Sequence, residues 1–189
     1  MNVPETPSLR WPTAAAVQSP RHMLPVYTDG AASGNGKRNC EGGIGVFFHD
    51  GSPLNHSQGF RCTPSAPVTN NTMELKAAVH ALETVALRGV PRGVEVRVYS
   101  DSLYTINCVT KWIRAWEKNG WRTKTGKPVA NKELIQRLAQ LSTQTAAVFR
   151  HVPSHTREPA RTSPEWAHWY GNNQADALAV RGIAALRAG

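Results

Sequence analysis

The amino-acid sequence predicts an α/β domain whose mixed five-stranded sheet has three antiparallel strands, then parallel strands, and is flanked by helices. Three short apolar segments separated by turn residues lie between residues 24 and 62, a pattern typical of an antiparallel meander. After residue 70, segments with strand periodicity alternate with segments with helix periodicity. Such alternation makes the later strands parallel to the first, because a helix carries the chain back between them.

The composition limits what this chain does. Its 189 residues include 22 Lys and Arg against 13 Asp and Glu, so the formal net charge is +9. An excess of this size favours a polyanionic partner, and nucleic acid is the first candidate. The three cysteines form no C-x-x-C pair, which argues against a disulfide scaffold or a thiolate zinc site and suits a reducing compartment. No segment approaches the roughly 20 apolar residues of a membrane helix, so we expect no membrane partner.

The first segment differs from the rest of the chain. Residues 1–23 carry four prolines and an alanine run without a regular period, so we expect a flexible leader before a domain at 24–189. The leader is poor in acids and bears arginine and serine, which is weakly similar to an organelle transit peptide, and an ordinary extension is the alternative. We expect an intracellular protein, nuclear or mitochondrial if the leader is a targeting signal and otherwise cytoplasmic.

Turn residues separate the first three predicted strands. Residues 24–28 are a short apolar strand that leads into Asp29-Gly30. Two further strands are predicted at 42–48 and 54–62, with a turn between them at 50–53, where Asp, Gly, Ser and Pro follow one another.

Helices and strands alternate in the remainder. Apolar residues recur at helical spacing over residues 70–88, and Asn70, Asn71 and Thr72 offer N-terminal caps for that helix. Residues 94–99 alternate as a strand. The remaining predicted elements are helices at 103–109, 131–142 and 171–187 and a strand at 146–152.

A basic segment holds most of the net charge. Residues 111–132 carry seven Lys or Arg and one acid, Glu117, which gives +6 of the total +9. Trp112, Trp116 and Trp121 are interleaved with these cations. Cations with flat rings suit phosphate neutralisation together with stacking or sugar contacts. A solvated basic helix whose tryptophans pack on the domain is the alternative, and the segment alone does not decide between the two.

Four carboxylates occupy positions that the predicted topology can bring together. Asp29 ends the first strand and Asp101 ends the fourth, so adjacent parallel strands would place them side by side. Glu74 lies in the first turn of the first long helix, and Asp176 lies early in the last one. Converging carboxylates repel, and a pair of Mg²⁺ ions would relieve this, since two ions about 4 Å apart are a known device for phosphoryl transfer. Taken singly, each acid has a simpler explanation as a turn residue, an N-cap or a helix-dipole partner.

Five short motifs, together with their order, resemble ribonuclease H type 1. The resemblance covers residues 24–183, and the basic protrusion at 111–132 is similar to that of the cellular enzymes. The motifs are Tyr27-Thr28-Asp29-Gly30, Asn70-Asn71 with Met73-Glu74, Tyr99-Ser100-Asp101-Ser102, Val152-Pro153-x-His155 and Gly171-Asn172-x-x-Ala175-Asp176.

The resemblance implies a ribonuclease-H-like fold and an endonuclease that cuts the RNA strand of RNA/DNA hybrids without sequence specificity. It implies two Mg²⁺ ions, with Mn²⁺ as a substitute, and a mobile histidine that assists proton transfer or product release. We expect a monomer, and no protein partner is implied. By matching position, the catalytic residues are Asp29, Glu74, Asp101, Asp176 and His155, the first four also binding metal; Asn35, Asn70 and Asn71 contact RNA; and Thr69, Tyr104, Trp112, Trp116 and Asn131 contact DNA.

The chain departs from the family pattern in two places. Pro67 and Val68 precede Thr69 where relatives often carry an arginine, which puts the DNA-phosphate pocket in doubt. Residues 156–170 form an inserted loop between His155 and the last helix, which is either a tolerated surface insertion or a contact for substrate or a partner. His151 and His168 are alternatives for the histidine role, and the Val-Pro-x-His context favours His155.

Two other classes of function remain. A non-catalytic nucleic-acid-binding or assembly module could keep this fold, although binding alone does not require mutually repelling acids. A two-metal nuclease for structured RNA or junction DNA is the third, and Asn35, Asn70 and Asn71 favour the hybrid instead because amides can read a 2′-hydroxyl.

Overall fold

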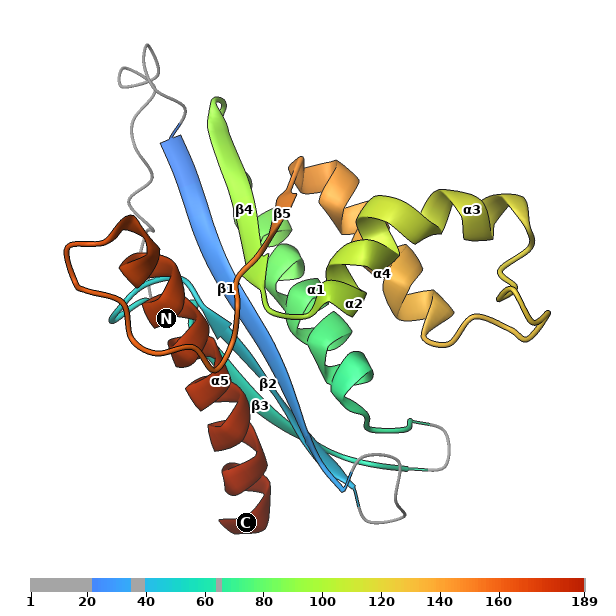
Figure 1. Cartoon of the computed structure of the whole chain (residues 1–189), viewed down its shortest axis with the longest axis horizontal. Helices are drawn as coiled ribbons and strands as arrows, with labels where there is room; N and C mark the ends of the chain where they lie inside the picture. The colour runs from blue at the N-terminus through green and yellow to red at the C-terminus, as the bar shows by residue number, and fades with distance from the viewer. Residues whose placement is uncertain (1–21, 35–39, 64–65, 189) are drawn as a thin grey trace, which may run out of the picture.

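The computed structural model describes residues 22–34, 40–63 and 66–188 (Figure 1). The expected leader lies outside these residues except for His22 and Met23, which already belong to the first strand. Among the described residues, no helix combines the length and apolar character needed to cross a bilayer. The elements in chain order are β1 (His22–Ser33), β2 (Glu41–Phe47), β3 (His56–Arg61), α1 (Asn70–Arg88), β4 (Val94–Ser100), α2 (Leu103–Asn107), the π-helical turn η2 (Cys108–Trp112), α3 (Ile113–Lys118), α4 (Lys132–Thr145), β5 (Val148–His151) and α5 (Pro164–Ala188).

The five strands form one mixed sheet in the order β3-β2-β1-β4-β5. β1 pairs antiparallel with β2, and β2 pairs antiparallel with β3, so the meander at the start of the domain is confirmed. β4 is parallel to β1, and β5 is parallel to β4. The predicted fold class, a mixed sheet with antiparallel strands followed by parallel strands and flanked by helices, is therefore confirmed.

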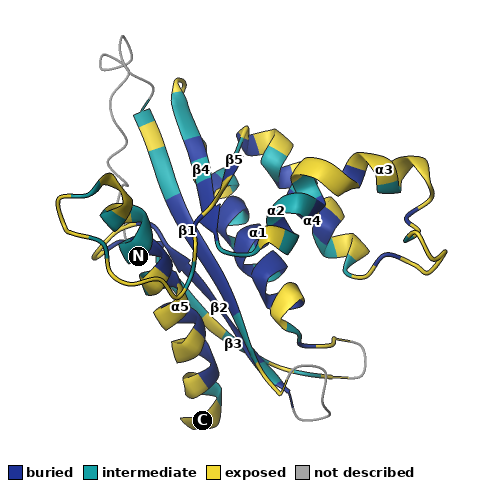
Figure 2. Cartoon of the chain, viewed as in Figure 1, coloured by how far each residue is buried: buried dark blue, intermediate teal, exposed yellow. Residues whose placement is uncertain are grey.

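Alternation along the strands builds a core on each face of the sheet. Val26 and Val98 are buried under α1 and α4, whereas the next residues, Tyr27 and Tyr99, are buried on the α5 face. This follows from the period of two in a strand, which turns successive side chains to opposite faces. Figure 1 shows α5 along one face of β1, β2 and β3, with α1 and α4 on the other, and Figure 2 shows burial concentrated between these layers.

Two elements, β1 and α5, differ most in extent from the prediction. β1 does not end at Thr28 but continues to Ser33, because β2 offers antiparallel partners as far as Ser33. α5 begins at Pro164 rather than at residue 171, so only the first part of the expected inserted loop at 156–170 is a loop. Proline is well suited to a first helical position.

Side-chain contacts explain the longer α5. The hydroxyl of Tyr170 donates to Asp50 Oδ1 at 2.9 Å, and its ring meets Phe47 edge-on at 6.0 Å. The Ser163 side chain accepts a hydrogen bond from the Glu165 backbone N–H at 3.3 Å, which satisfies a donor at the helix start. The two Tyr170 contacts join residues far apart in sequence, and periodicity along the chain does not reveal them.

Small residues allow α5 to lie directly on the sheet. A Cβ atom at Gly45 of β2 would lie 1.9 Å from the backbone oxygen of Ala175, and one at Gly59 of β3 would lie 2.2 Å from that of Gly182. Both contacts are with helix backbone, which cannot rotate away as a flexible side chain can. The position of α5, and of Asp176 on it, therefore depends on the absence of side chains at these points of the sheet.

We expect Gly45→Ala to destabilise the protein by about 3 kcal/mol, at the upper end of overpacking effects, because the methyl group forces α5 away from the sheet. Gly51→Ala is the control, since its Cβ meets nothing within 4 Å and the change costs about 1 kcal/mol through its positive φ. Urea unfolding followed by circular dichroism measures both. Equal losses for the two variants would show that α5 does not depend on this close contact.

Candidate active site

Parallel pairing of β1 and β4 brings the first two carboxylates together. The last parallel pair in the register is Tyr27 with Tyr99, and Asp29 and Asp101 each follow two residues later. Equal offsets from a shared pair place both acids at the same edge, at the carboxyl end of β4. Asp29 is buried, and Asp101 is half-buried. The predicted proximity of these two residues is confirmed.

Glu74 is brought to Asp29 by close packing of α1 on β1. A Cβ atom at Gly30 would lie 2.1 Å from the Glu74 backbone nitrogen, so only glycine allows the helix this near the strand. Thr69 caps α1, where its hydroxyl accepts from the Thr72 N–H at 3.1 Å. The cap is thus Thr69 rather than the predicted Asn70, Asn71 or Thr72, although Thr72 completes a capping box by accepting from the Thr69 N–H at 2.7 Å.

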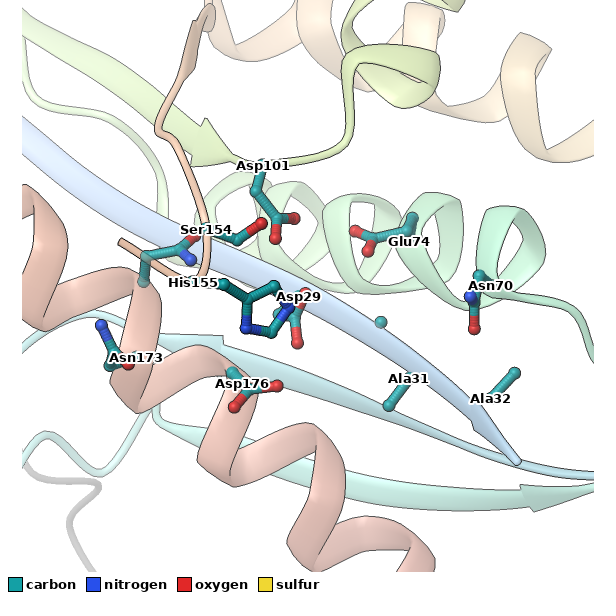
Figure 3. A pocket seen from close by; sticks show the side chains of 12 residues that line it. Asp29, Ala31, Ala32, Asn70, Glu74, Asp101, Ser154, His155, Asn173 and Asp176 are labelled. Atoms are coloured by element: carbon teal, nitrogen blue, oxygen red, sulfur yellow. The ribbon is translucent and has the colours of Figure 1, made fainter. Parts of the chain in front are cut away.

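A pocket of about 320 Å³ contains all four predicted carboxylates and His155. Asp29, Glu74 and Asp101 offer oxygen atoms within 4.8 Å of one another. Asp176 reaches the pocket from the exposed face of α5 and stands outside this closest group. Figure 3 shows the acids entering from β1, α1, the end of β4 and α5, four elements that are distant in sequence.

Crowding of like charges perturbs these acids. Burial, together with the negative charges of Asp101 and Asp176, raises the pKa of Asp29 to about 7. Burial, followed by the charges of Asp29 and Asp101, raises the pKa of Glu74 well above its ordinary value. When no cation is bound in the pocket, the protonated forms of Asp29 and Glu74 are therefore favoured.

The donor set fits a hard divalent cation. Glu74 Oε2 is buried, and no hydrogen-bond partner for it exists within the described part of the chain. No lysine or arginine is found among the described residues that line the pocket, so no basic side chain of that lining neutralises the acids. Several carboxylate oxygens within a few ångströms match the ligands that Mg²⁺ prefers. These residues could hold a metal, whose identity the geometry leaves open.

The structure separates the three candidate histidines. His155 follows β5, is exposed, has a left-handed φ of 54°, and lines the carboxylate pocket. His151 lies on β5. His168 lies in the first turns of α5, where its Nδ1 forms a hydrogen bond of 3.1 Å with the Tyr27 hydroxyl. Both line a different pocket. His155 is thus the histidine that the fold brings to the acids.

The residues expected to contact RNA divide into three groups. Asn70 lies at the start of α1 and lines the carboxylate pocket. Asn71 is exposed on the same turn but is not one of the described residues that line it. Asn35 lies outside the described residues.

Three of the five residues expected to contact DNA form a row of rings on α2, η2 and α3. Tyr104 contacts Trp112 edge-on at 6.1 Å between ring centroids, and Trp112 lies 5.6 Å from Trp116. Trp112 is 39% exposed, so its ring is available to a ligand. The Asn131 side-chain amide donates to the Tyr104 hydroxyl at 3.3 Å. Thr69 lies apart from this row, at the start of α1, where its hydroxyl caps the helix.

The pocket includes polar residues that the sequence did not single out as site residues. Ser154, Asn172 and Asn173 all line it. Asn172 is buried, and its Oδ1 has no hydrogen-bond partner among the described residues. It lies one helical turn before Asp176, so helical spacing from that acid was an available signal. Asn173, three residues before Asp176 on the same helix, has a similar spacing, whereas no comparable signal exists for Ser154.

Comparisons with known proteins agree on one family. A sequence profile of the RNase H family matches residues 21–184. The rat protein named Ribonuclease H1 (Rattus norvegicus) is 38% identical over 157 residues, which is 83% of this chain and 49% of that protein. The human protein of the same name (Homo sapiens) gives the same values. The chain thus spans about half the length of these mammalian relatives.

A bacterial relative and a solved structure are covered more fully. The protein named Ribonuclease H from Maricaulis maris (strain MCS10) is 37% identical over 164 residues, which is 87% of this chain and 95% of that protein. The crystal structure of LC9-RNase H1, a type 1 RNase H with the type 2 active-site motif, superposes with a TM-score of 0.64 at 24% identity, over 89% of this chain and 75% of the other. At that identity, the structural likeness shows the fold alone. From the profile match and the sequence relatives, we conclude that this chain belongs to the RNase H family.

Proposed function

We propose that this protein is a Mg²⁺-dependent endonuclease that hydrolyses the RNA strand of RNA/DNA hybrids. The observation that carries the proposal is the convergence of Asp29, Glu74, Asp101 and Asp176 in one pocket, without a cationic side chain among its described lining residues. Relatives named Ribonuclease H and Ribonuclease H1 support the same reaction and substrate. Crowded acids cost stability, so their presence indicates a function that requires them. A purely binding or assembly role would not need them.

The metal site would be formed by these four acids. Two Mg²⁺ ions held there would supply the chemistry of water activation for attack on the scissile phosphate and of charge stabilisation at the departing oxygen. Water adds to phosphorus as the bond to the ribose 3′-oxygen breaks, which yields a 5′-phosphate and a 3′-hydroxyl. His155, which is exposed and lines the pocket, would move a proton at the leaving or attacking oxygen.

Recognition of a hybrid requires different contacts for each strand. An amide side chain can both donate to and accept from a 2′-hydroxyl, and Asn70 lies beside the acids where the RNA would pass. The row formed by Tyr104, Trp112 and Trp116 offers flat apolar rings that suit deoxyribose. Basic residues of the 111–132 segment are interleaved with these tryptophans along the chain and would neutralise the DNA backbone without reading bases.

The substrate class is tested by incubating the protein with end-labelled RNA/DNA, RNA/RNA and DNA/DNA duplexes in Mg²⁺ and in EDTA. We expect cleavage of the RNA in the hybrid alone, and only in Mg²⁺. Asp101→Asn should bind the hybrid but cleave it roughly a hundredfold or more slowly, because several kcal/mol of transition-state stabilisation depend on the metal site. Wild-type turnover by this variant would contradict the proposed metal-binding role of the acids. Cleavage of the DNA/DNA duplex would contradict the proposed substrate class.

Crowding of the acids predicts how metal-free protein responds to pH. Folding raises the pKa of Asp29 from 3.8 to about 7, so the folded state binds more protons than the unfolded state between these values. The free energy of unfolding therefore falls as pH rises through this range. In EDTA, Asp29→Asn should raise Tm at pH 8 by roughly 4 °C or more and have little effect at pH 4.

Calorimetry at the two pH values measures this difference, with Glu117→Gln as a control for loss of an exposed acid. Mg²⁺ should raise the Tm of the wild-type protein more than that of Asp29→Asn. An equal Tm change at pH 4 and pH 8 would contradict electrostatic crowding at Asp29.

Replacing both Trp112 and Trp116 with alanine should weaken hybrid binding by at least roughly tenfold, because each ring offers stacking or sugar contacts worth about 1–3 kcal/mol. The pocket acids are untouched, so the effect of Mg²⁺ on Tm should be preserved. Fluorescence anisotropy with a labelled hybrid at moderate salt measures the affinity. An unchanged affinity would exclude the ring row from the substrate path.

A further inference from the structure

A second cavity, of about 590 Å³, lies beside the catalytic pocket and has no part in the proposed reaction. Its walls come from β4, from β5, and from the segment that leads through residues 152–163 into the first turns of α5. Figure 1 shows this segment leaving the sheet edge at β5 and crossing toward α5. Residues of the predicted inserted loop at 156–170 thus contribute one part of the cavity's lining. Its volume is within the range of pockets that take small organic ligands.

Guanidinium groups give this cavity a positive lining. Arg97, Arg150 and Arg157 line it, and Glu165 is the one carboxylate among its described lining residues. Arg97 forms an ion pair with Glu95, so part of its charge is already compensated. Arg150 and Arg157 are exposed, and within the described ranges neither forms an ion pair. Two arginines thus remain for an anionic ligand.

Flat rings form a wall that is held in place by its own contacts. The His168 ring stacks on Tyr99 with centroids 4.3 Å apart, and Tyr99 stacks on Tyr27 at 5.0 Å. Hydrogen bonding between His168 Nδ1 and the Tyr27 hydroxyl, at 3.1 Å, fixes the imidazole. The Trp169 indole N–H donates to the Thr156 carbonyl oxygen at 3.1 Å, which ties the loop to the helix. The cavity is thus built by interlocking side chains.

We propose that this cavity binds a nucleotide, with the base against the ring wall and the phosphate on Arg150 and Arg157. Guanidinium forks bind phosphate oxygens in pairs, and they would engage a phosphate at the exposed side of the cavity. Val152, Pro153 and Trp169 add apolar surface that inorganic phosphate alone would leave uncovered. A planar base joined to a phosphate matches both parts of the lining, whether the nucleotide is free or is one residue of a single strand.

The site is separate from the catalytic pocket but adjoins it. Pro153 lines the nucleotide cavity, whereas Ser154 and His155, the next two residues, line the carboxylate pocket. No residue is common to the two described linings. Nucleotide binding can therefore be measured with the catalytic site disabled and without metal.

Isothermal titration of the full chain in EDTA tests the proposal with adenosine 5′-monophosphate, adenosine, inorganic phosphate and a single-stranded DNA tetra-adenylate as probes. We expect saturable binding of the monophosphate or of the tetra-adenylate, with adenosine and phosphate each at least roughly tenfold weaker because each fills only part of the lining. Binding of the monophosphate indicates a free nucleotide, and binding of the tetra-adenylate alone indicates a strand. No saturable binding of either probe would overturn the proposal.

Variants locate the binding. Replacing Arg150 and Arg157 together with alanine should weaken it at least roughly tenfold, whereas Arg181→Ala, an exposed arginine elsewhere on α5, should not. Asp101→Asn should leave it unchanged. Arg157→Glu in the loop before α5 provides a second variant should the double one fold poorly, and an unaltered Tm establishes folding. Undiminished binding by the arginine variants, or loss of binding in Asp101→Asn, would place the ligand outside this cavity.

Discussion

The contact between Gly30 and the backbone of Met73 and Glu74 is the constraint on which the site depends. A methyl group at residue 30 would lie 2.1 Å from the Glu74 nitrogen, so a larger residue there would push α1 away from the sheet. The same contact determines where Glu74 lies relative to Asp29, because Asp29 directly precedes Gly30 on β1. Packing and chemistry are thus set by one close approach between a strand and a helix.

The fold holds its acids in a state that opposes folding. Burial and mutual repulsion raise the pKa values of Asp29 and Glu74, so the domain must stabilise them through contacts made elsewhere. The two-sided core supplies that stability, since α1 and α5 cover opposite faces of the same sheet. An electrostatic cost of this kind is typical of sites where charge is arranged for catalysis rather than for stability.

The sequence was informative where the signal was local. Strand ends at Asp29 and Asp101, combined with the expected parallel pairing, predicted their proximity, and the helix at 70–88 was predicted with the bounds that α1 has. The resemblance, rather than any spacing, brought His155 into the set. What could not be predicted arises from contacts between distant segments. The start of α5 at Pro164 depends on Tyr170 meeting Phe47 and Asp50. The cap at Thr69 was missed for a different reason, because it depends on a local reciprocal hydrogen bond with Thr72 next to three other polar residues that could cap the helix.

The root of the basic protrusion has a mechanical consequence. Trp121 is buried and packs next to Trp116 at the end of the ring row. Its backbone N–H donates to the Trp116 carbonyl oxygen at 2.7 Å, and its carbonyl oxygen accepts from the Val129 backbone N–H at 3.0 Å. Both sides of the loop are therefore hydrogen-bonded to the backbone of a residue whose side chain is buried in the core. A surface held in this way would already have its binding shape before the proposed duplex arrives, so little conformational entropy would be lost on docking.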